Sequence, residues 1–206
     1  MPDFAAGLLS LRGHLAYLDV VPDGPAARGP GWLPLDAPLH DPDLTRRWVE
    51  RYAEITRAQS GVAPPGMPSA FVLQHHLDPL AQVVATAAVR GTWVLDADPA
   101  RWAVRLEPTF GYPVAVRVAK GESAEVADLG ERVRRAQAGY LVAAAEIATA
   151  FPAAHRMSSR QRLGMGRDMW RGALRRLLGG PLPRRESCCL LYALPAMHPC
   201  GGCPRV

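Results

Sequence analysis

The chain has 206 residues, 49% of them hydrophobic, and a formal net charge of +5. This length suits one domain and can bury about 70% of the surface that the unfolded chain exposes, so folding by itself requires no disulfide or metal. No stretch approaches the roughly eighteen consecutive apolar residues of a transmembrane helix, so we expect at most peripheral association with a membrane.

The first residues and the excess of basic residues indicate compartment and partners. The opening stretch, MPDFAAGLLSLRGHLAYLDV, lacks a basic region followed by an apolar core, so the cytoplasm is the expected compartment. Thiols stay reduced there, which favours metal ligands or redox groups over a disulfide framework. The positive charge comes without an aromatic-basic RNA-binding motif or a clear recognition helix, so no nucleic-acid partner is expected.

The first half of the chain reads as helices joined by loops. Apolar residues spaced three and four apart predict an amphipathic helix over 3–18, and the proline- and glycine-rich residues 22–40 predict a loop. A second helix is expected over 41–61, with an aspartate as its N-cap and a glycine as its stop. A third helical region over 67–91 contains Pro79, which predicts a kink or a restart of the helix.

The second half changes from strands to helices. Alternating apolar and polar residues predict strands over 101–106 and 114–118, paired antiparallel around the turn PTFGYP, with a further short strand over 92–95. Helical spacing returns over 123–150 and 158–180, where Gly-Gly-Pro ends the last helix. The predicted fold class is α+β, a mainly helical single domain with a small central antiparallel β-sheet.

The cysteines occupy one short segment. They lie in the final stretch ESCCLLYALPAMHPCGGCPRV, at Cys188, Cys189, Cys200 and Cys203. We therefore divide the chain into a body, residues 1–183, and a cysteine segment, residues 184–206, packed on the same domain.

Several kinds of site could use this spacing. A zinc ribbon needs two Cys-x-x-Cys pairs, and only CGGC fits one of them. Adjacent side chains of a strand point to opposite faces, so Cys188 and Cys189 suit a 2Fe-2S cluster, which divides four thiolates between two irons, better than one zinc ion. A structural zinc site is the alternative, and a vicinal disulfide at 188–189 would be strained. The glycines of CGGC would allow backbone N–H groups to turn toward sulfur.

The stretch CCLLYALPAMHPCGGCP closely resembles the C-terminal signature of the FhuF-type ferric-siderophore reductases. The matching residues are Cys188, Cys189, Tyr192, Leu194, Pro195, Cys200, Cys203 and Pro204, preceded by Arg184 and Arg185 as in the family. The resemblance implies a 2Fe-2S cluster held by all four cysteines. It further implies an enzyme that reduces ferric iron in an imported siderophore by one-electron transfer and releases ferrous iron in the cytoplasm.

The expected partners follow from this resemblance and from motifs that the chain lacks. The substrate would be a ferric siderophore, a hydroxamate in preference to a catecholate. No nucleotide-binding or nucleophile motif is present, so electrons are expected from a separate donor such as a ferredoxin or flavodoxin. No catalytic residue beyond the cluster is expected.

Three neighbouring residues are candidates for supporting roles. Arg184 and Arg185 could favour the reduced form of an anionic cluster or dock an acidic donor. His198 could hydrogen-bond near the ligands. The alternatives from other classes are a non-enzymatic iron-sulfur or zinc protein, structural or sensing iron and redox state, and an electron-transfer accessory of a biosynthetic pathway.

Overall fold

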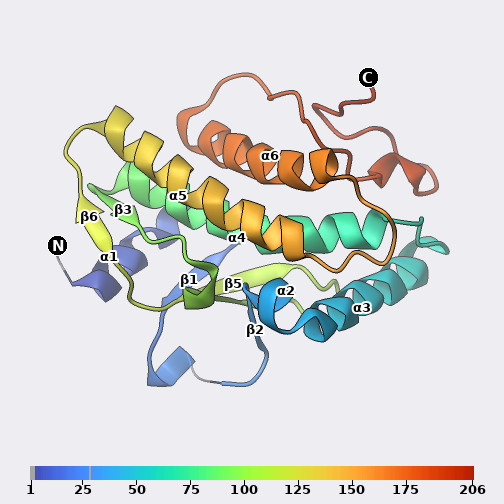
Figure 1. The fold of residues 1–206 in the computed structure, drawn as a ribbon, viewed down its shortest axis with the longest axis horizontal. Coiled ribbons are helices and arrows are strands. Elements are labelled where there is room, and N and C mark those ends of the chain that lie inside the picture. The colour runs from blue at the N-terminus through green and yellow to red at the C-terminus, as the bar shows by residue number, and fades with distance from the viewer. Residues whose placement is uncertain (1–2, 28) are drawn as a thin grey trace.

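The computed structural model describes residues 3–27 and 29–206 (Figure 1). The helices are α1 (Phe4–Ser10), α2 (Ala37–His40), α3 (Pro42–Ser60), α4 (Met67–Arg90), α5 (Leu129–Ala150) and α6 (Ser159–Leu178). The strands are β1 (Asp19–Pro22), β2 (Trp32–Pro34), β3 (Trp93–Leu95), β4 (Trp102–Leu106), β5 (Pro113–Val118) and β6 (Ser123–Glu125). Within this described part, no helix combines the length and the hydropathy that crossing a bilayer requires.

α4 is the central helix, and its sequence is apolar on nearly every side. Leu73, Leu77, Leu80 and Val84 on it are fully buried, as expected for a helix without a polar face. α5 and α6 pack along it, and Figure 1 shows α4 between α6 and the sheet. Burying one such side chain contributes about 1.5–3 kcal/mol, so α4 organises the core.

α5 and α6 are joined closely through one tyrosine. The hydroxyl of Tyr140 donates to the carbonyl of Gly166 at 3.0 Å, and its ring stacks on Trp170 with 5.4 Å between the ring centroids. Gly166 permits the approach, because a Cβ there would lie 3.1 Å from the Cβ of Ala144. These contacts hold α6 in place on the body.

The main sheet has four strands in the order β1-β5-β4-β2. The strands expected over 101–106 and 114–118 are confirmed as the antiparallel pair β4 and β5, with Trp102 opposite Val118. β2 is antiparallel to β4, but β1 runs parallel to β5, so the sheet is mixed rather than antiparallel. The strand expected over 92–95 is β3, which pairs with β6 in a separate two-stranded sheet.

The helix expected over 3–18 is wrong beyond its first turns. α1 ends at Ser10 and a short 3-10 helix follows over Arg12–His14. The Nε of Arg12 donates to the carbonyl of Val20 at 3.0 Å, so the chain turns back on itself to bring β1 beside β5. Strand pairing far along the chain therefore overrides the local helical spacing, which Gly13 already weakens.

Two further boundaries differ from expectation. Residues 22–40 hold β2 and α2 as well as loops, because β2 forms the edge of the sheet beside β4. The helix expected over 123–150 begins only at Leu129, after β6, where the Asp128 carboxylate accepts from the Glu131 N–H at 2.8 Å. The spacing of apolar residues along the chain does not reveal β2 or β6, because each short strand forms only by pairing with a strand elsewhere in the sequence.

α4 continues through Pro79 without a restart. A proline inside a helix costs about 3 kcal/mol, and burial of α4 against its neighbours offsets that cost. Asp78 therefore caps no new helix. It accepts from Tyr17 and, at 2.6 Å, from Gln82, and it pairs with Arg176 at 3.0 Å.

The remaining expected helices are confirmed as α3 and α6. Asp41 caps α3 by accepting from the Leu44 N–H at 3.0 Å, and Gly61 ends it with φ of 75°. Ser158 caps α6 by accepting from the Gln161 N–H at 3.1 Å. The prediction of a mainly helical α+β single domain is confirmed.

Burial of a histidine on α4 predicts a pH-dependent stability. His76 is 1% exposed, and burial lowers its pKa from 6.5 to about 4, against a hydrogen bond to the Val72 carbonyl at 2.9 Å that raises it. Between these values the unfolded chain binds more protons than the folded chain. The contribution of neutral His76 to the free energy of unfolding is therefore complete above pH 6.5 and is lost as the pH falls toward 4. We expect the free energy of unfolding to fall by about 1.4 kcal/mol per pH unit in this window.

Urea unfolding at pH 6.5 and 4.5 measures this slope. The control is His76→Gln, which keeps a hydrogen-bond donor but does not titrate. The pH dependence of its free energy of unfolding should be smaller by the slope that one bound proton gives, about 1.4 kcal/mol per pH unit. Burial also lowers the pKa of the neighbouring His75, to about 3. His75 is present in both proteins, so its contribution cancels in the comparison and the difference in slope reports His76. Equal slopes in the two proteins would contradict it.

Candidate metal centre

The cysteine segment is fastened to α6 by the carboxylate of Asp168, which is 5% exposed. Its Oδ1 accepts from the Glu186 N–H at 2.8 Å, and its Oδ2 accepts from the N–H and the hydroxyl of Ser187 at 2.9 and 2.6 Å. Hydrogen bonds to an ionised acceptor are about twice as strong as neutral ones. Asp168 therefore fixes the backbone immediately before Cys188.

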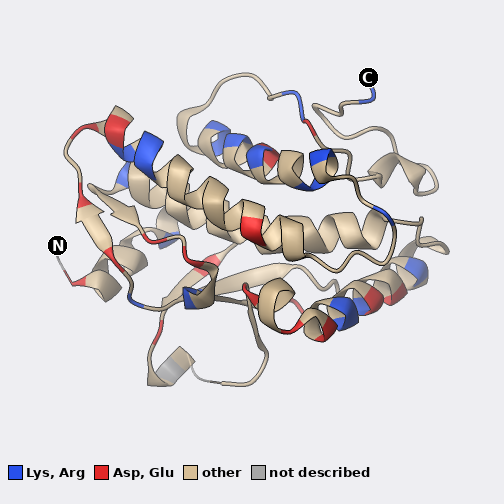
Figure 2. Ribbon diagram, viewed as in Figure 1, with Lys and Arg blue, Asp and Glu red and all other residues tan. Residues whose placement is uncertain are grey.

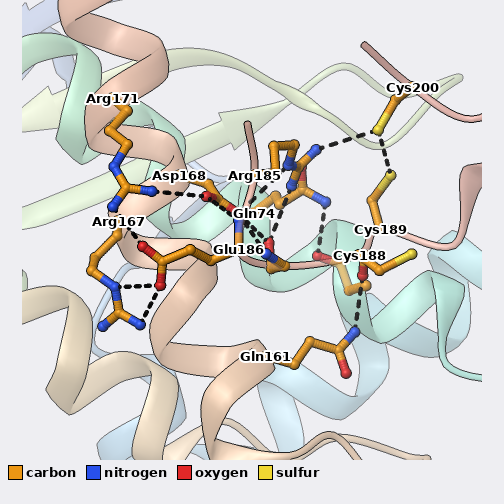
Figure 3. Close-up of polar contacts among 12 residues, drawn as sticks. Gln74, Gln161, Arg167, Asp168, Arg171, Arg185, Glu186, Cys188, Cys189 and Cys200 are labelled. Carbon is orange, nitrogen blue, oxygen red and sulfur yellow. Dashed lines mark hydrogen bonds and ion pairs between the residues drawn. The ribbon is translucent and has the colours of Figure 1, made fainter. Parts of the chain in front are cut away.

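Arg185 turns from this anchor toward the thiols (Figure 3). Its Nε lies 3.6 Å from the Asp168 Oδ2, and its Nη2 donates to the Gln74 Oε1 at 3.2 Å. Its Nη1 lies 4.0 Å from the Sγ of Cys200. The Arg185 side chain is 17% exposed, so this positive charge is held near the cysteines by α4 and α6 together.

Glu186 points the opposite way, toward α6 (Figure 3). Its carboxylate accepts from Arg167 at 2.8 Å and from Arg171 at 2.5 Å. The hydrogen bond from Arg167, with that from Arg171, holds the pKa of Glu186 below its usual value. The adjacent residues Arg185 and Glu186 thus point in opposite directions, the guanidinium toward the thiols and the carboxylate toward α6.

The structure separates the two candidate arginines and leaves the candidate histidine apart. Arg184 is exposed and donates to the carbonyl of Val206 at 3.2 Å. His198 is also exposed. In the described chain, neither side chain makes a hydrogen bond to a cysteine, whereas Arg185 does reach one.

The four thiols occupy two kinds of environment. Cys189 and Cys203 are buried, Cys188 and Cys200 are half-buried, and all four are free thiols. The Sγ atoms of Cys189 and Cys200 are 3.7 Å apart (Figure 3). Across the part of the chain that the structure describes, no three His, Cys, Asp or Glu side chains gather closely enough to hold one ion.

The Cys189 and Cys200 pair fits two ligands of one metal ion. A tetrahedral ion with bonds of about 2.3 Å to sulfur places two thiolates about 3.8 Å apart, close to the 3.7 Å observed. The Nε of Arg185 is buried without a hydrogen-bond partner among the described residues, and this buried cation suits a centre that carries negative charge. The pair and the cation fit a metal centre with thiolate ligands.

Leu190, Ala196 and Gly202 adopt left-handed conformations in the segment, and the first and last of them shape it near the cysteines. Leu190, with φ of 63°, turns the chain directly after the adjacent cysteines. Gly202 has φ of 75°, and its carbonyl accepts from the Arg185 N–H at 2.7 Å. A Cβ at Gly202 would lie 2.4 Å from the Pro183 carbonyl oxygen. In the described chain, the Cys200 sulfur is contacted by the Arg185 side chain and by the Cys189 thiol, and not by the expected backbone N–H groups of CGGC.

The surroundings of the site raise the pKa of two groups, the Cys200 thiol and the Tyr52 hydroxyl. Burial raises the pKa of Cys200, and the nearby Cys189 raises it further, while Arg185 lowers it. A metal that binds here would therefore displace protons from the thiols. Burial, with a smaller effect of Cys189, raises the pKa of Tyr52 to about 12. Tyr52 on α3 stacks on Phe71 of α4, with 5.8 Å between the ring centroids, so the tyrosine that is influenced by Cys189 also joins α3 to α4.

Sequence reasoning missed the residues that position the segment. Asp168 is the single acidic residue of α6, in an otherwise basic helix, and that isolation was the available signal. Gln74 and Gln161, which binds the Cys188 carbonyl at 2.9 Å, carry no such signal. Their roles depend on how the helices pack.

Comparison with known proteins adds no family to this description. No protein-family model matches the chain, and no curated protein matches it. The argument about function therefore rests on the cysteine segment and the residues that hold it.

Proposed function

We propose that this chain is a 2Fe-2S protein that passes one electron to ferric iron in a siderophore chelate and so releases ferrous iron. The observation that carries the proposal is the thiol pair of Cys189 and Cys200, 3.7 Å apart, beside the guanidinium of Arg185. The spacing suits two ligands of one iron, and the positive charge suits an anionic cluster. The resemblance of CCLLYALPAMHPCGGCP to the ferric-siderophore reductases supports the same assignment.

The chain's own residues would hold and tune the centre. All four cysteines would supply thiolates, and Asp168 would keep the segment on α6. When bound, a 2Fe-2S cluster supplies one electron at a time, at a potential that neighbouring charges and hydrogen bonds adjust. Among the described residues, Arg185 brings a positive charge to 4.0 Å from the Sγ of Cys200, while Cys188 is half-buried.

The reaction requires one electron and neither a nucleophile nor a proton donor from the chain. A separate carrier of the ferredoxin or flavodoxin class is oxidised by one electron, and Fe(III) of the chelate becomes Fe(II). Hard oxygen ligands hold Fe(II) less strongly than Fe(III), so reduction loosens the iron and leaves the chelator intact. We place the reaction in the cytoplasm, where thiols stay reduced, and expect hydroxamate chelates to be used in preference to catecholates.

The test begins with protein purified without oxygen. We expect about two irons and two acid-labile sulfides per chain, the content of a four-cysteine 2Fe-2S centre. The protein is then reduced with dithionite, freed of excess reductant and mixed in a stopped-flow instrument with a stoichiometric ferric hydroxamate. Loss of the reduced spectrum should coincide with capture of Fe(II) by a ferrous chelator.

Two results would replace the proposal by its alternatives. A colourless protein with one zinc after anaerobic reconstitution would indicate a structural zinc site. A full cluster that passes no electron to any of several ferric hydroxamates or catecholates would indicate a non-enzymatic iron-sulfur protein or an electron-transfer accessory.

The position of Arg185 predicts a difference between the two adjacent arginines. The reduced centre carries one more negative charge than the oxidised centre, so a nearby cation favours reduction. We expect Arg185→Gln to lower the midpoint potential by about 30–60 mV, where about 60 mV is a tenfold change for one electron. Arg185→Lys should restore most of the loss, and the exposed Arg184→Gln is the matched control.

A redox titration followed by absorbance measures these potentials. Equal shifts in Arg185→Gln and Arg184→Gln would mean that proximity to Cys200 has no effect. Circular dichroism confirms that the variants remain folded.

A further inference from the structure

A cavity lies beside the candidate centre, and one thiol forms part of its wall. Its volume is about 490 Å³, and its lining includes Cys188, Gln161, Glu186, Arg156, Arg160 and Arg205. This size falls in the range of cavities that bind small molecules. Cys188 and Cys200 are half-buried while Cys189 and Cys203 are buried, and Cys188 lines the cavity, so a ligand there lies beside one of the two more accessible thiols.

The lining of this cavity carries more positive than negative charge. Arg156 and Arg160 are exposed, and neither pairs with an acidic side chain among residues 3–27 and 29–206. Arg205 lies over the Tyr192 ring, 5.0 Å from its centroid, a contact that leaves its charge uncancelled. Glu186 is the acidic residue of the lining, and Arg167 and Arg171 outside the cavity already pair with it.

Basic residues also surround the cavity on a larger scale. Figure 2 shows them along α6 and in the segment that leads into it. The cavity adjoins the amino end of α6, where Ser158 and Gln161 line it, and the partial positive charge of a helix amino terminus acts in the same direction. The three guanidiniums nevertheless supply most of the positive potential.

We propose that this cavity binds the ferric chelate and selects chelates with a net negative charge, such as those with a free carboxylate at their periphery. The inference rests on the proposed function, because it names the substrate class of that reaction. Arg156, Arg160 and Arg205 would bind the peripheral anionic groups and so place the ferric ion beside Cys188. A hollow of this volume suits a small chelate better than the convex surface of a carrier protein.

Gallium(III) chelates test binding separately from electron transfer, since gallium(III) resembles iron(III) in coordination and accepts no electron here. The probes are the gallium complexes of desferrioxamine B, which its free amine makes cationic, and of N-succinyl desferrioxamine B, which its carboxylate makes anionic. Their metal-binding hydroxamates are the same. By isothermal titration at low salt, we expect the anionic complex to bind the full-length protein about tenfold more tightly. Added salt should reduce the difference.

Variants assign the preference to the cavity. Arg156→Gln combined with Arg160→Gln should weaken binding of the anionic complex about tenfold and leave binding of the cationic complex no weaker. Arg175→Gln is the control, because it removes an exposed arginine from α6, the helix that carries Arg160, about 22 Å further along. Both altered arginines are exposed, so the fold should be unchanged by circular dichroism.

The outcomes separate this inference from the proposed function. Equal affinity for the two gallium complexes, or a double variant that behaves like Arg175→Gln, overturns the inference, while the ferric complexes can still be reduced. A double variant that slows reduction by a ferredoxin but binds gallium chelates normally also overturns it and assigns the cavity to the donor. If the anionic gallium complex binds as expected but no ferric complex takes an electron, the cavity is supported and the reductase proposal fails.

Discussion

Replacing Asp168 with alanine will release the cysteine segment from α6. The substitution leaves two backbone N–H groups and the Ser187 hydroxyl without their shared acceptor, and it leaves the charge of Arg185 without its carboxylate. Removing one partner of a buried ion pair costs about 3–5 kcal/mol. The cost falls on the attachment of the segment, because α6 itself is held to α5 through Tyr140 and Trp170.

Thiol labelling of the metal-free protein measures this release. Cys189 and Cys203 are buried, so they react only when the segment opens. We expect their labelling rate to rise about 100-fold or more in Asp168→Ala, as 3 kcal/mol implies. The matched control is Asp43→Ala, which removes an exposed aspartate that pairs with Arg46 and should change the rate little.

Two observations would contradict the anchoring role of Asp168. One is an unchanged labelling rate in Asp168→Ala. The other is the loss of most of the helical circular dichroism in Asp168→Ala, which would mean that the whole domain unfolds and not the segment alone. An intermediate labelling rate in Asp168→Asn would support the role, because asparagine keeps one acceptor oxygen but loses the charge.

If the chain holds the proposed 2Fe-2S centre, Cys203→Ser should lose the iron almost completely and yet remain folded. Cys203 is 2% exposed, and serine replaces its thiolate by a hydroxyl, which is a poor ligand for iron. The core around α4 consists of residues from the body and does not depend on the segment for its apolar contacts. We expect iron and sulfide near background after reconstitution, with most of the helical circular dichroism retained.

The control for Cys203→Ser is His198→Ala in the same segment. His198 is exposed, so its removal should leave the iron content unchanged. Iron loss in His198→Ala would make the histidine a ligand or a necessary neighbour of one. Global unfolding of Cys203→Ser would instead indicate that the metal is needed for the fold, as in structural zinc sites.

The elements predicted correctly are those whose signals are local. α3 and α6 have capping residues at their starts and glycines at their ends, and β4 and β5 alternate apolar and polar residues around a tight turn. The elements missed depend on distant partners. β1 becomes a strand because β5 offers it an edge, and α1 is shortened because the chain must reach that edge.

The candidate site divides in the same way. The presence, number and spacing of four thiols within one short segment are properties of the amino-acid sequence, because a few bonds along the chain limit how far Cys188 and Cys189, or Cys200 and Cys203, can separate. The resemblance of the segment to a reductase signature is likewise independent of the fold.

The neighbours of those thiols are determined by packing. Arg184 and Arg185 are equivalent in the sequence, but Asp168 and Gln74 lie on two helices that meet beneath Arg185, so one guanidinium faces Cys200 and the other faces solvent. The cavity beside Cys188 arises in the same way, where the start of α6 meets the cysteine segment. Such contacts join residues far apart along the chain, and their energies exist only once α4, α5 and α6 have buried their shared apolar surface.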